Sequence, residues 1–133
     1  MAQRPLIYLT STQYDRLTES IIGAIFEVAN ILGPGFLETV YHRSLLNELN
    51  LRGIRAVSEV PLPVFYKEQS VGKFLADIVV EDIIILELKC VESLRDEHIA
   101  QCINYLRASR LKLCLLINFQ KPKVEWRRIV LNF

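Results

Sequence analysis

The sequence has little that would connect it to a membrane or to a strongly charged partner. No apolar run approaches the roughly 20 residues that a membrane-spanning helix needs, and residues 1–10, MAQRPLIYLT, lack the apolar stretch of a signal peptide. The formal net charge of the 133-residue chain is only +1, so its overall charge gives no electrostatic case for binding nucleic acid. Basic residues are denser from Arg107 to Arg128, where they form either a solvated surface or contacts with phosphate. We therefore expect a cytoplasmic protein with no membrane partner.

Cysteine and glycine are also scarce, which excludes several kinds of site. The three cysteines form no CxxC pair, and their odd number fits reduced thiols in a cytosolic protein. The sequence has no glycine-rich phosphate loop, no zinc-ligand cluster and no spacing typical of Ser-His-Asp or Cys-His catalysis. Five Gly and five Pro leave no room for a long linker, so we expect a single domain over residues 1–133.

Three segments have the spacing of amphipathic helices. Residues 13–32 repeat apolar side chains at steps of three and four, until the sequence GPG at 33–35 stops the helix. A second helix is expected from about residue 36 to residue 51, before Gly53, and a third from residue 95 to residue 109.

The other regular segments have the composition of β-strands. Pro61 and Pro63 each remove a backbone donor from the first strand, which favours an edge strand or a bend. Turns are expected at residues 68–73 and at Glu81 and Asp82. The order α-α-β-β-β-α-β-β predicts an α/β fold with a mixed sheet flanked by helices. The expected strands cover residues 54–67, 74–80, 83–90, 112–119 and 124–133.

Charged side chains interrupt the most apolar part of the chain, ADIVVEDIIILELKC at residues 76–90. Glu87 and Lys89 are two residues apart on one expected strand, so both point to the same face, where they could form a buried ion pair. Asp77 on the preceding strand adds a second carboxylate and leaves net negative charge. A hard divalent cation with oxygen ligands would balance that charge, and the backbone carbonyl of Leu88 could supply a further ligand.

The two carboxylates can meet only if the connection between their strands has a particular length. With a two-residue connection, Asp77 would lie opposite Leu86 and would face away from Glu87. Residues that lie directly opposite each other share a face, so an odd loop or a bulge is required. We therefore predict a three-residue loop or a bulge between Ile78 and Ile84.

This arrangement of acids and lysine resembles the signature of the PD-(D/E)xK nuclease superfamily. Asp77 stands on one strand and Glu87-x-Lys89 on the next, in the order that the superfamily uses, although Ala76 occupies the position of the usual Pro. Two further motifs extend the resemblance.

One motif lies at the start of the second helix and the other lies on the third helix. GFLETVY at residues 35–41 reads G-x-x-Glu38-x-x-Tyr41 and resembles the motif that names the GxxExxY protein family. Taken alone, this pair would be a helix N-terminal acid and a half-buried tyrosine on one helix face. Gln101 and Tyr105 in QCINY resemble the QxxxY motif of RecB-type and lambda-exonuclease-type members of the superfamily, and taken alone they would be ordinary polar positions.

The similarity to the GxxExxY family covers residues 17–130, with two departures outside the motifs. The family usually has a His where this chain has Ala29, and it favours a Gly near Cys114. Neither histidine is assigned a role, because His98 is expected on a helix surface and His42 is expected to point away from the neighbouring tyrosine of the motif.

The resemblance implies a restriction-endonuclease-like core and a metal-dependent nuclease that hydrolyses phosphodiester bonds in nucleic acid. It implies one or two Mg²⁺ or Mn²⁺ ions held by the acids, and a lysine that orients the attacking water or stabilises charge on the phosphate. The implied site residues are Glu38, Asp77, Glu87 and Lys89 for catalysis, Tyr41, Gln101 and Tyr105 for substrate, and Glu38, Asp77, Glu87 and Leu88 for the metal.

The expected partner is nucleic acid, with DNA placed before RNA although the sequence does not separate the two. A homodimer is a further expectation, because a chain this small often needs a second copy to hold a duplex. Two alternatives stay open: a nuclease fold that binds or regulates without turnover, and a cluster of acids and lysine that is only a structural ion pair.

Overall fold

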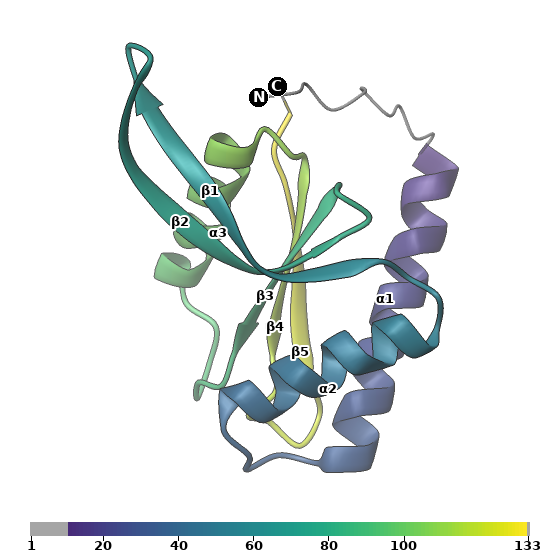
Figure 1. Cartoon of the computed structure of the whole chain (residues 1–133). Helices are drawn as coiled ribbons and strands as arrows, with labels where there is room; N and C mark the ends of the chain where they lie inside the picture. The colour runs from purple at the N-terminus through teal and green to yellow at the C-terminus, as the bar shows by residue number, and fades with distance from the viewer. Residues whose placement is uncertain (1–10, 133) are drawn as a thin grey trace.

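A computed structural model describes residues 11–132, in which three helices and five strands follow in the expected order (Figure 1). Residues 1–10, where no signal peptide is expected, lie outside the described residues. Phe133, the end of the last expected strand, also lies outside them. The elements are α1 (Ser11–Leu32), α2 (Glu38–Leu51), β1 (Ala56–Tyr66), β2 (Gln69–Val80), β3 (Ile84–Lys89), α3 (Asp96–Ser109), β4 (Leu113–Asn118) and β5 (Glu125–Val130).

The five strands form one mixed sheet in the order β1-β2-β3-β4-β5. Strands β3 and β4 are parallel because α3 carries the chain back across the sheet between them, whereas the other pairs are antiparallel. Strand β1 lies at the edge of the sheet, as Pro61 and Pro63 predict. The predicted α/β fold with a mixed sheet is therefore confirmed.

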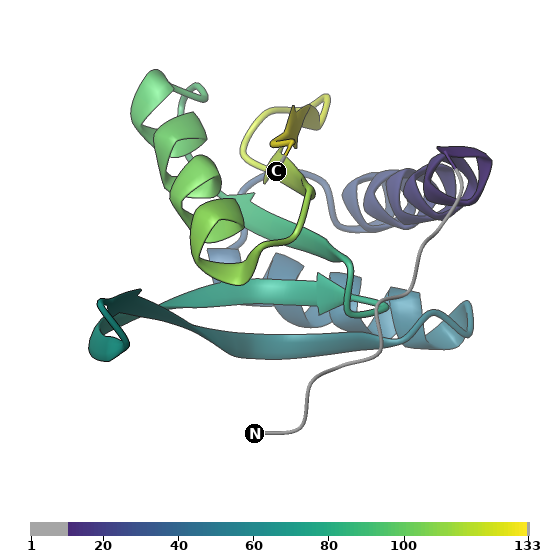
Figure 2. The same ribbon diagram turned by 90° about the horizontal axis from the view of Figure 1, so that it is seen from above.

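Helices cover both faces of the central strands. Figure 2 places α3 and α1 on opposite sides of β3, β4 and β5. Residues of α1 and α2 pack with Leu86 and Leu115 in one apolar cluster, and residues of α3 pack with Ile85 and Leu116 in a second. Strands β3 and β4 are consequently buried on both faces, which explains why their sequences are nearly continuous runs of Ile and Leu.

Several element boundaries differ from those that the sequence predicts, and the largest difference lies in the β1–β2 hairpin. The expected turn at residues 68–73 is wrong for most of its length, because β2 begins at Gln69 and pairs with β1 almost to the tip of the hairpin. Lys67 and Glu68 alone make the turn, and both have positive φ, +46° and +69°, as tight hairpin turns require. Helix α2 begins at Glu38 rather than at residue 36.

The β1–β2 hairpin twists sharply where it meets the rest of the sheet. Ala76 packs with the α3 cluster, whereas Ile78 packs with the α1–α2 cluster, although side chains two apart on a regular strand share a face. Opposite this point Glu59 has φ of +54°. Asp77, between Ala76 and Ile78, therefore lies where the strand changes direction. Beyond that point the β1–β2 hairpin projects away from the body of the molecule (Figure 1).

No helix within residues 11–132 combines the length and the apolar character needed to cross a bilayer.

Candidate active site

The connection between β2 and β3 decides which side chains meet at the site. It consists of residues 81–83, because Val80 pairs with Ile84, and the register continues to Ile78 opposite Leu86. The same register places Asp77 opposite Glu87, so the prediction of a three-residue loop or a bulge is confirmed, and the loop is the form it takes.

This loop is held in its unusual conformation by one arginine. Glu81 and Asp82 both have positive φ, +51° and +60°, which non-glycine residues rarely adopt. The backbone N–H of Arg55 donates to Glu81 Oε1 at 2.8 Å, and the Arg55 guanidinium donates to Asp82 Oδ2 at 2.6 Å. These contacts fix the turn and, with it, the register of the acidic strands.

Beyond Ile78 and Leu86, strands β2 and β3 separate. From there side-chain oxygens replace the backbone carbonyls as hydrogen-bond acceptors between the strands. The backbone N–H of Asp77 donates to Glu87 Oε1 at 3.1 Å, and the backbone N–H of Leu88 donates to Asp77 Oδ2 at 2.8 Å. Each carboxylate therefore uses one oxygen to satisfy the backbone of the neighbouring strand. The second oxygen of each is left for another partner.

Lys89 is the nearest cation, and its contact with the acids is weak. Its Nζ lies 4.0 Å from Glu87 Oε2, at the outer limit of an ion pair, and the Lys89 side chain is 20% exposed whereas that of Glu87 is 3% exposed. One lysine at this distance cannot neutralise both Glu87 and Asp77. The cluster consequently has surplus negative charge when both acids are ionised.

The pKa of Glu87 is raised by burial and by the negative charge of Asp77. Burial is the largest cause that raises the pKa of Glu87, and the negative charge of Asp77 adds to it, so that the pKa reaches about 8 from an ordinary 4.5. The backbone N–H of Asp77 and the charge of Lys89 lower it, but less strongly. A satisfied ion pair would lower the pKa of the acid, and Lys89, at 4.0 Å, lowers it by less than burial and Asp77 raise it.

Glu38 approaches the same strands from the start of α2. Partial burial raises the pKa of its carboxyl, the charge of Asp77 raises it further, and Lys89, His42 and a hydrogen bond from the Cys90 backbone act in the opposite direction. These interactions place the Glu38 carboxylate beside the end of β3, although the residue as a whole is exposed.

The donor set fits a hard divalent cation, with one restriction on geometry. Asp77 and Glu87 present carboxylate oxygens and surplus negative charge, which are the features that Mg²⁺ and Mn²⁺ prefer. Across residues 11–132, however, no three His, Cys, Asp or Glu side chains are arranged to hold a metal ion by themselves. Glu38 therefore stands apart from the paired acids, and a backbone oxygen such as that of Leu88, or water, would complete the coordination.

The spacing of the motif at residues 35–41 has a structural explanation. Gly35 has φ of +111°, which a residue with a side chain rarely adopts. The Tyr41 hydroxyl donates to the carbonyl of Gly33 at 2.6 Å and accepts from the N–H of Phe36 at 3.2 Å, while its ring stacks on Phe119. Tyr41 is fully buried. Burial leaves none of its surface for substrate, so the expected direct contact is corrected to a positioning role for the loop.

The two residues of the motif on α3 form a hydrogen-bonded pair. Gln101 Nε2 donates to the Tyr105 hydroxyl at 3.0 Å, and the Tyr105 ring packs against Phe74 of β2 at 5.2 Å between centroids. Burial raises the pKa of Tyr105, and the nearby charges of Glu87 and Asp77 raise it further, so the phenol stays protonated. Because it accepts from Gln101, the phenol keeps its own proton for donation to another group.

The two histidines have contacts that the sequence reasoning did not assign. His42 lies one turn after Glu38 on α2, near enough to lower the pKa of that acid, and its Nε2 lies 2.7 Å from Ser58 Oγ. The i, i+4 spacing from Glu38 could have revealed this neighbour. His98 Nδ1 accepts the N–H of Arg95 at 2.9 Å and so caps the start of α3.

Asn118 is a further residue that the sequence reasoning missed. It is fully buried at the end of β4, beside Lys89 in the parallel register. Its Oδ1 accepts from the N–H groups of Val91 and Gln120 at 3.1 and 3.2 Å, and its Nδ2 donates to the carbonyl of Val91 at 2.8 Å. Asn118 thereby fixes the chain just after Lys89, and a polar residue closing the apolar run LCLLIN was the available signal.

Comparisons with known proteins agree on the fold. A family model described as the PD-(D/E)XK nuclease superfamily matches residues 15–129. The crystal structure of SSO0001 superposes with a TM-score of 0.57 and 18% identity over 92% of this chain, which spans 61% of SSO0001. The alkaline exonuclease LHK-Exo from Laribacter hongkongensis gives a TM-score of 0.53 and 12% identity over 95% of this chain and 73% of that enzyme. No curated protein sequence matches the chain.

The raised pKa of Glu87 predicts how the stability of the metal-free protein depends on pH. Between the ordinary value of 4.5 and about 8, the folded protein keeps a proton that the unfolded chain releases. The free energy of unfolding should therefore fall as pH rises through this window, by at most about 1.4 kcal/mol per pH unit from this group. Glu87→Gln should flatten that slope and stabilise the protein at the upper end of the window.

Urea unfolding of both proteins in the presence of a chelator measures these slopes, with Glu92→Gln, an exposed acid, as the control that keeps the wild-type slope. A loss of stability in Glu87→Gln at every pH would instead support a purely structural ion pair.

Tyr41→Phe should destabilise the protein without changing its core packing. The substitution keeps the ring that stacks on Phe119 but leaves the carbonyl of Gly33 and the N–H of Phe36 without the hydroxyl. The expected loss is roughly 1–3 kcal/mol in the free energy of unfolding, measured by urea titration. The matched substitution Tyr66→Phe, at an exposed tyrosine of the hairpin, should change it by no more than about 0.5 kcal/mol. Equal effects would mean that the Tyr41 hydroxyl does not hold the loop.

Proposed function

Because this chain belongs to the PD-(D/E)XK nuclease superfamily, we propose that it is a metal-dependent nuclease that hydrolyses phosphodiester bonds in nucleic acid. The observation that carries this proposal is the pairing of the Asp77 and Glu87 carboxylates where β2 and β3 part, with Lys89 at the rim. The site lies toward the carboxyl end of β3, which is parallel to β4, and in α/β sheets this is the usual place for ligands.

Asp77 and Glu87 are the residues that would hold Mg²⁺ or Mn²⁺, with the carbonyl of Leu88 as a further ligand. Glu38 would assist through a water, since it stands apart from the paired acids. When bound, the cation would polarise the scissile phosphate and lower the pKa of a water. The raised pKa of Glu87 implies that this residue gives up a proton when the cation binds, so we expect affinity to increase with pH.

The other residues act on the substrate and on the developing charge. Lys89 is partly exposed and two residues beyond Glu87, so its ammonium would orient the attacking water or stabilise the charge on the phosphate in the transition state. Gln101 and Tyr105 form one hydrogen-bonded pair. The Tyr105 hydroxyl of this pair would donate its proton in a hydrogen bond to the phosphate. Tyr41 would act indirectly, by holding the loop before Glu38.

Several finer assignments belong to the same proposal. The position of Glu38 beside the end of β3 supports placing the chain in the GxxExxY group. The match over residues 15–129 supports one nuclease-like domain. We propose DNA as the substrate ahead of RNA, and a homodimer as the form that grips a duplex.

A second candidate is a nuclease fold that binds nucleic acid without turnover. The observation in its favour is that no three acid, histidine or cysteine side chains within residues 11–132 form a metal group on their own. Metal affinity separates the two candidates, because only the nuclease requires it.

Isothermal calorimetry with Mn²⁺ tests the metal site. Wild-type protein should bind Mn²⁺ and release a proton to the buffer, because Glu87 must ionise, whereas Asp77→Asn and Glu87→Gln should each lose measurable binding. Glu92→Gln, which alters an exposed acid between β3 and α3, should bind as wild type does. If the wild-type protein gave no heat of Mn²⁺ binding across pH 6–9, the result would favour a nuclease fold that binds nucleic acid without turnover.

Cleavage assays test the role of the lysine. Lys89→Ala should reduce cleavage of single- and double-stranded DNA by roughly 100-fold or more in the presence of Mn²⁺, since it removes charge stabilisation in the transition state. Lys112→Ala is the matched control, because Lys112 is exposed and precedes β4 at the opposite end of the sheet. RNA of the same sequence serves as the comparison substrate. Equal activity in wild-type and Lys89→Ala preparations would trace the cleavage to a contaminant and defeat the assignment.

A further inference from the structure

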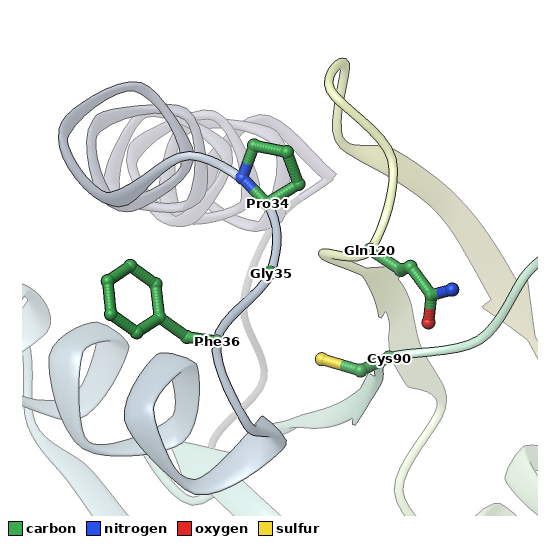
Figure 3. Close-up of a pocket in the computed structure, with 5 residues that line it drawn as sticks. All are labelled: Pro34, Gly35, Phe36, Cys90 and Gln120. Atoms are coloured by element: carbon green, nitrogen blue, oxygen red, sulfur yellow. The ribbon is translucent and has the colours of Figure 1, made fainter.

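A cavity of about 390 Å³ opens beside the candidate active site, and no role has yet been given to it. Its lining residues are Pro34, Gly35 and Phe36 from the loop before α2, Cys90 after β3, and Gln120 after β4 (Figure 3). This volume lies within the range of small-ligand sites, about 300–1,000 Å³.

The cavity shares structural elements with the catalytic cluster. Cys90 directly follows Lys89, and its backbone is near enough to the Glu38 carboxylate to lower the pKa of that acid. The carbonyl of Lys89 accepts the N–H of Phe119 at 3.0 Å, and Gln120 is the next residue along the chain. Any group in the cavity would therefore lie immediately beyond Lys89, on the side where α2 begins.

The lining has the chemistry of a base-binding site rather than that of a phosphate-binding site. Figure 3 shows the Pro34 ring beside the backbone of Gly35 and the Cys90 thiol pointing toward that loop, with Gln120 across from the loop and its amide turned outward, and the Phe36 ring turned to the other side. None of these five residues is charged. Apolar surfaces accept the flat face of a base, and an amide can both donate to and accept from a base edge.

Charge suited to a nucleotide's phosphates lies next to the cavity rather than inside it. Lys121 and Lys123 follow Gln120 on the same loop, and Lys121 Nζ lies 3.5 Å from Glu125 Oε2. Lys89 lies on the other side, one residue before Cys90. Basic residues therefore neighbour the cavity lining along the chain on both sides, one residue before Cys90 and directly after Gln120.

The wall formed by residues 33–36 is held in place before any ligand arrives. Gly33 donates to the carbonyl of Ala29 at 2.9 Å and so closes α1, while the Tyr41 hydroxyl holds the Gly33 carbonyl and the Phe36 N–H. A preformed wall reduces the ordering cost of binding.

We propose that this cavity receives the unpaired base of the nucleotide adjacent to the scissile phosphate. The proposal rests on the proposed nuclease function and deepens it by naming a substrate class. A base must leave its stack to enter a pocket, so the preferred substrate is single-stranded, or frayed, at the cleavage position. Gln120 is then a specificity-determining residue, and Cys90 is part of the cavity lining.

Alkylation of Cys90 tests occupancy without requiring catalysis. All three cysteines lie in the described part of the chain, and there Cys90 alone is not buried, so a maleimide should label it selectively in the folded protein. Burial and the charge of Glu38 raise the pKa of the Cys90 thiol, so labelling is followed at alkaline pH. With a chelator present, dAMP should suppress most of the labelling, whereas deoxyribose 5-phosphate and inorganic phosphate should not. Equal protection by all three would assign the cavity to phosphate, and absence of protection by dAMP would overturn the proposal.

Cleavage of modified oligonucleotides tests the contribution of the base to the reaction. Removing the base at one position next to the cleaved bond should raise KM for single-stranded substrate by roughly 2- to 10-fold in the wild-type protein, the equivalent of about one hydrogen bond. Gln120→Ala should raise KM on the intact substrate and show a smaller further loss on the abasic one. Gln69→Ala, an exposed glutamine on the hairpin, is the matched control and should behave as wild type.

The two proposals fail in distinguishable ways. Cleavage that depends on Lys89 but is indifferent to the missing base at every position would overturn the base-binding cavity and leave the nuclease assignment intact. Protection of Cys90 by dAMP in a protein without cleavage would retain the cavity and reject turnover.

Discussion

The exchange of hydrogen bonds between the Asp77 and Glu87 carboxylates and the backbone of the opposite strand is the interaction on which the site depends. Where β2 and β3 part, the N–H groups of Asp77 and Leu88 lose their ladder partners, and the two carboxylates replace them. An unsatisfied buried donor costs about 1–3 kcal/mol, so these acids support the fold while they concentrate negative charge. One structural solution thus produces the opening in the sheet and the charge that a cation would neutralise.

The surrounding elements bring further groups to this opening from both faces of the sheet. Helix α2 contributes Glu38, whose position depends on the loop that Tyr41 holds, and α3 contributes the Gln101–Tyr105 pair. A metal-dependent hydrolase needs this combination of paired oxygen ligands, a nearby cation and a proton donor. One fold can carry many activities, so the activity is argued from the residues of the site. The solved neighbours, at 18% and 12% identity, show the fold.

The sequence predicts the features that follow from the periodicity of apolar side chains. It does not predict how deeply a side chain is buried or which distant strands pair. Requiring Asp77 and Glu87 to share a face was enough to predict a three-residue loop or a bulge, and the structure has the loop. Spacing places Tyr41 on the same helix face as Glu38 but does not reveal that Tyr41 is fully buried. The weak strand propensity of the residues next to Gly72 predicts a turn, whereas pairing with β1 makes them a strand.

A crystal of the protein soaked in Mn²⁺ and measured for anomalous scattering tests the central claim most directly. The account predicts an anomalous peak between the carboxylates of Asp77 and Glu87, within about 2.0–2.5 Å of an oxygen from each, with the Lys89 ammonium displaced to the rim. An absence of any peak, with Lys89 Nζ hydrogen bonded to both acids, would contradict it and leave the cluster as a structural ion pair.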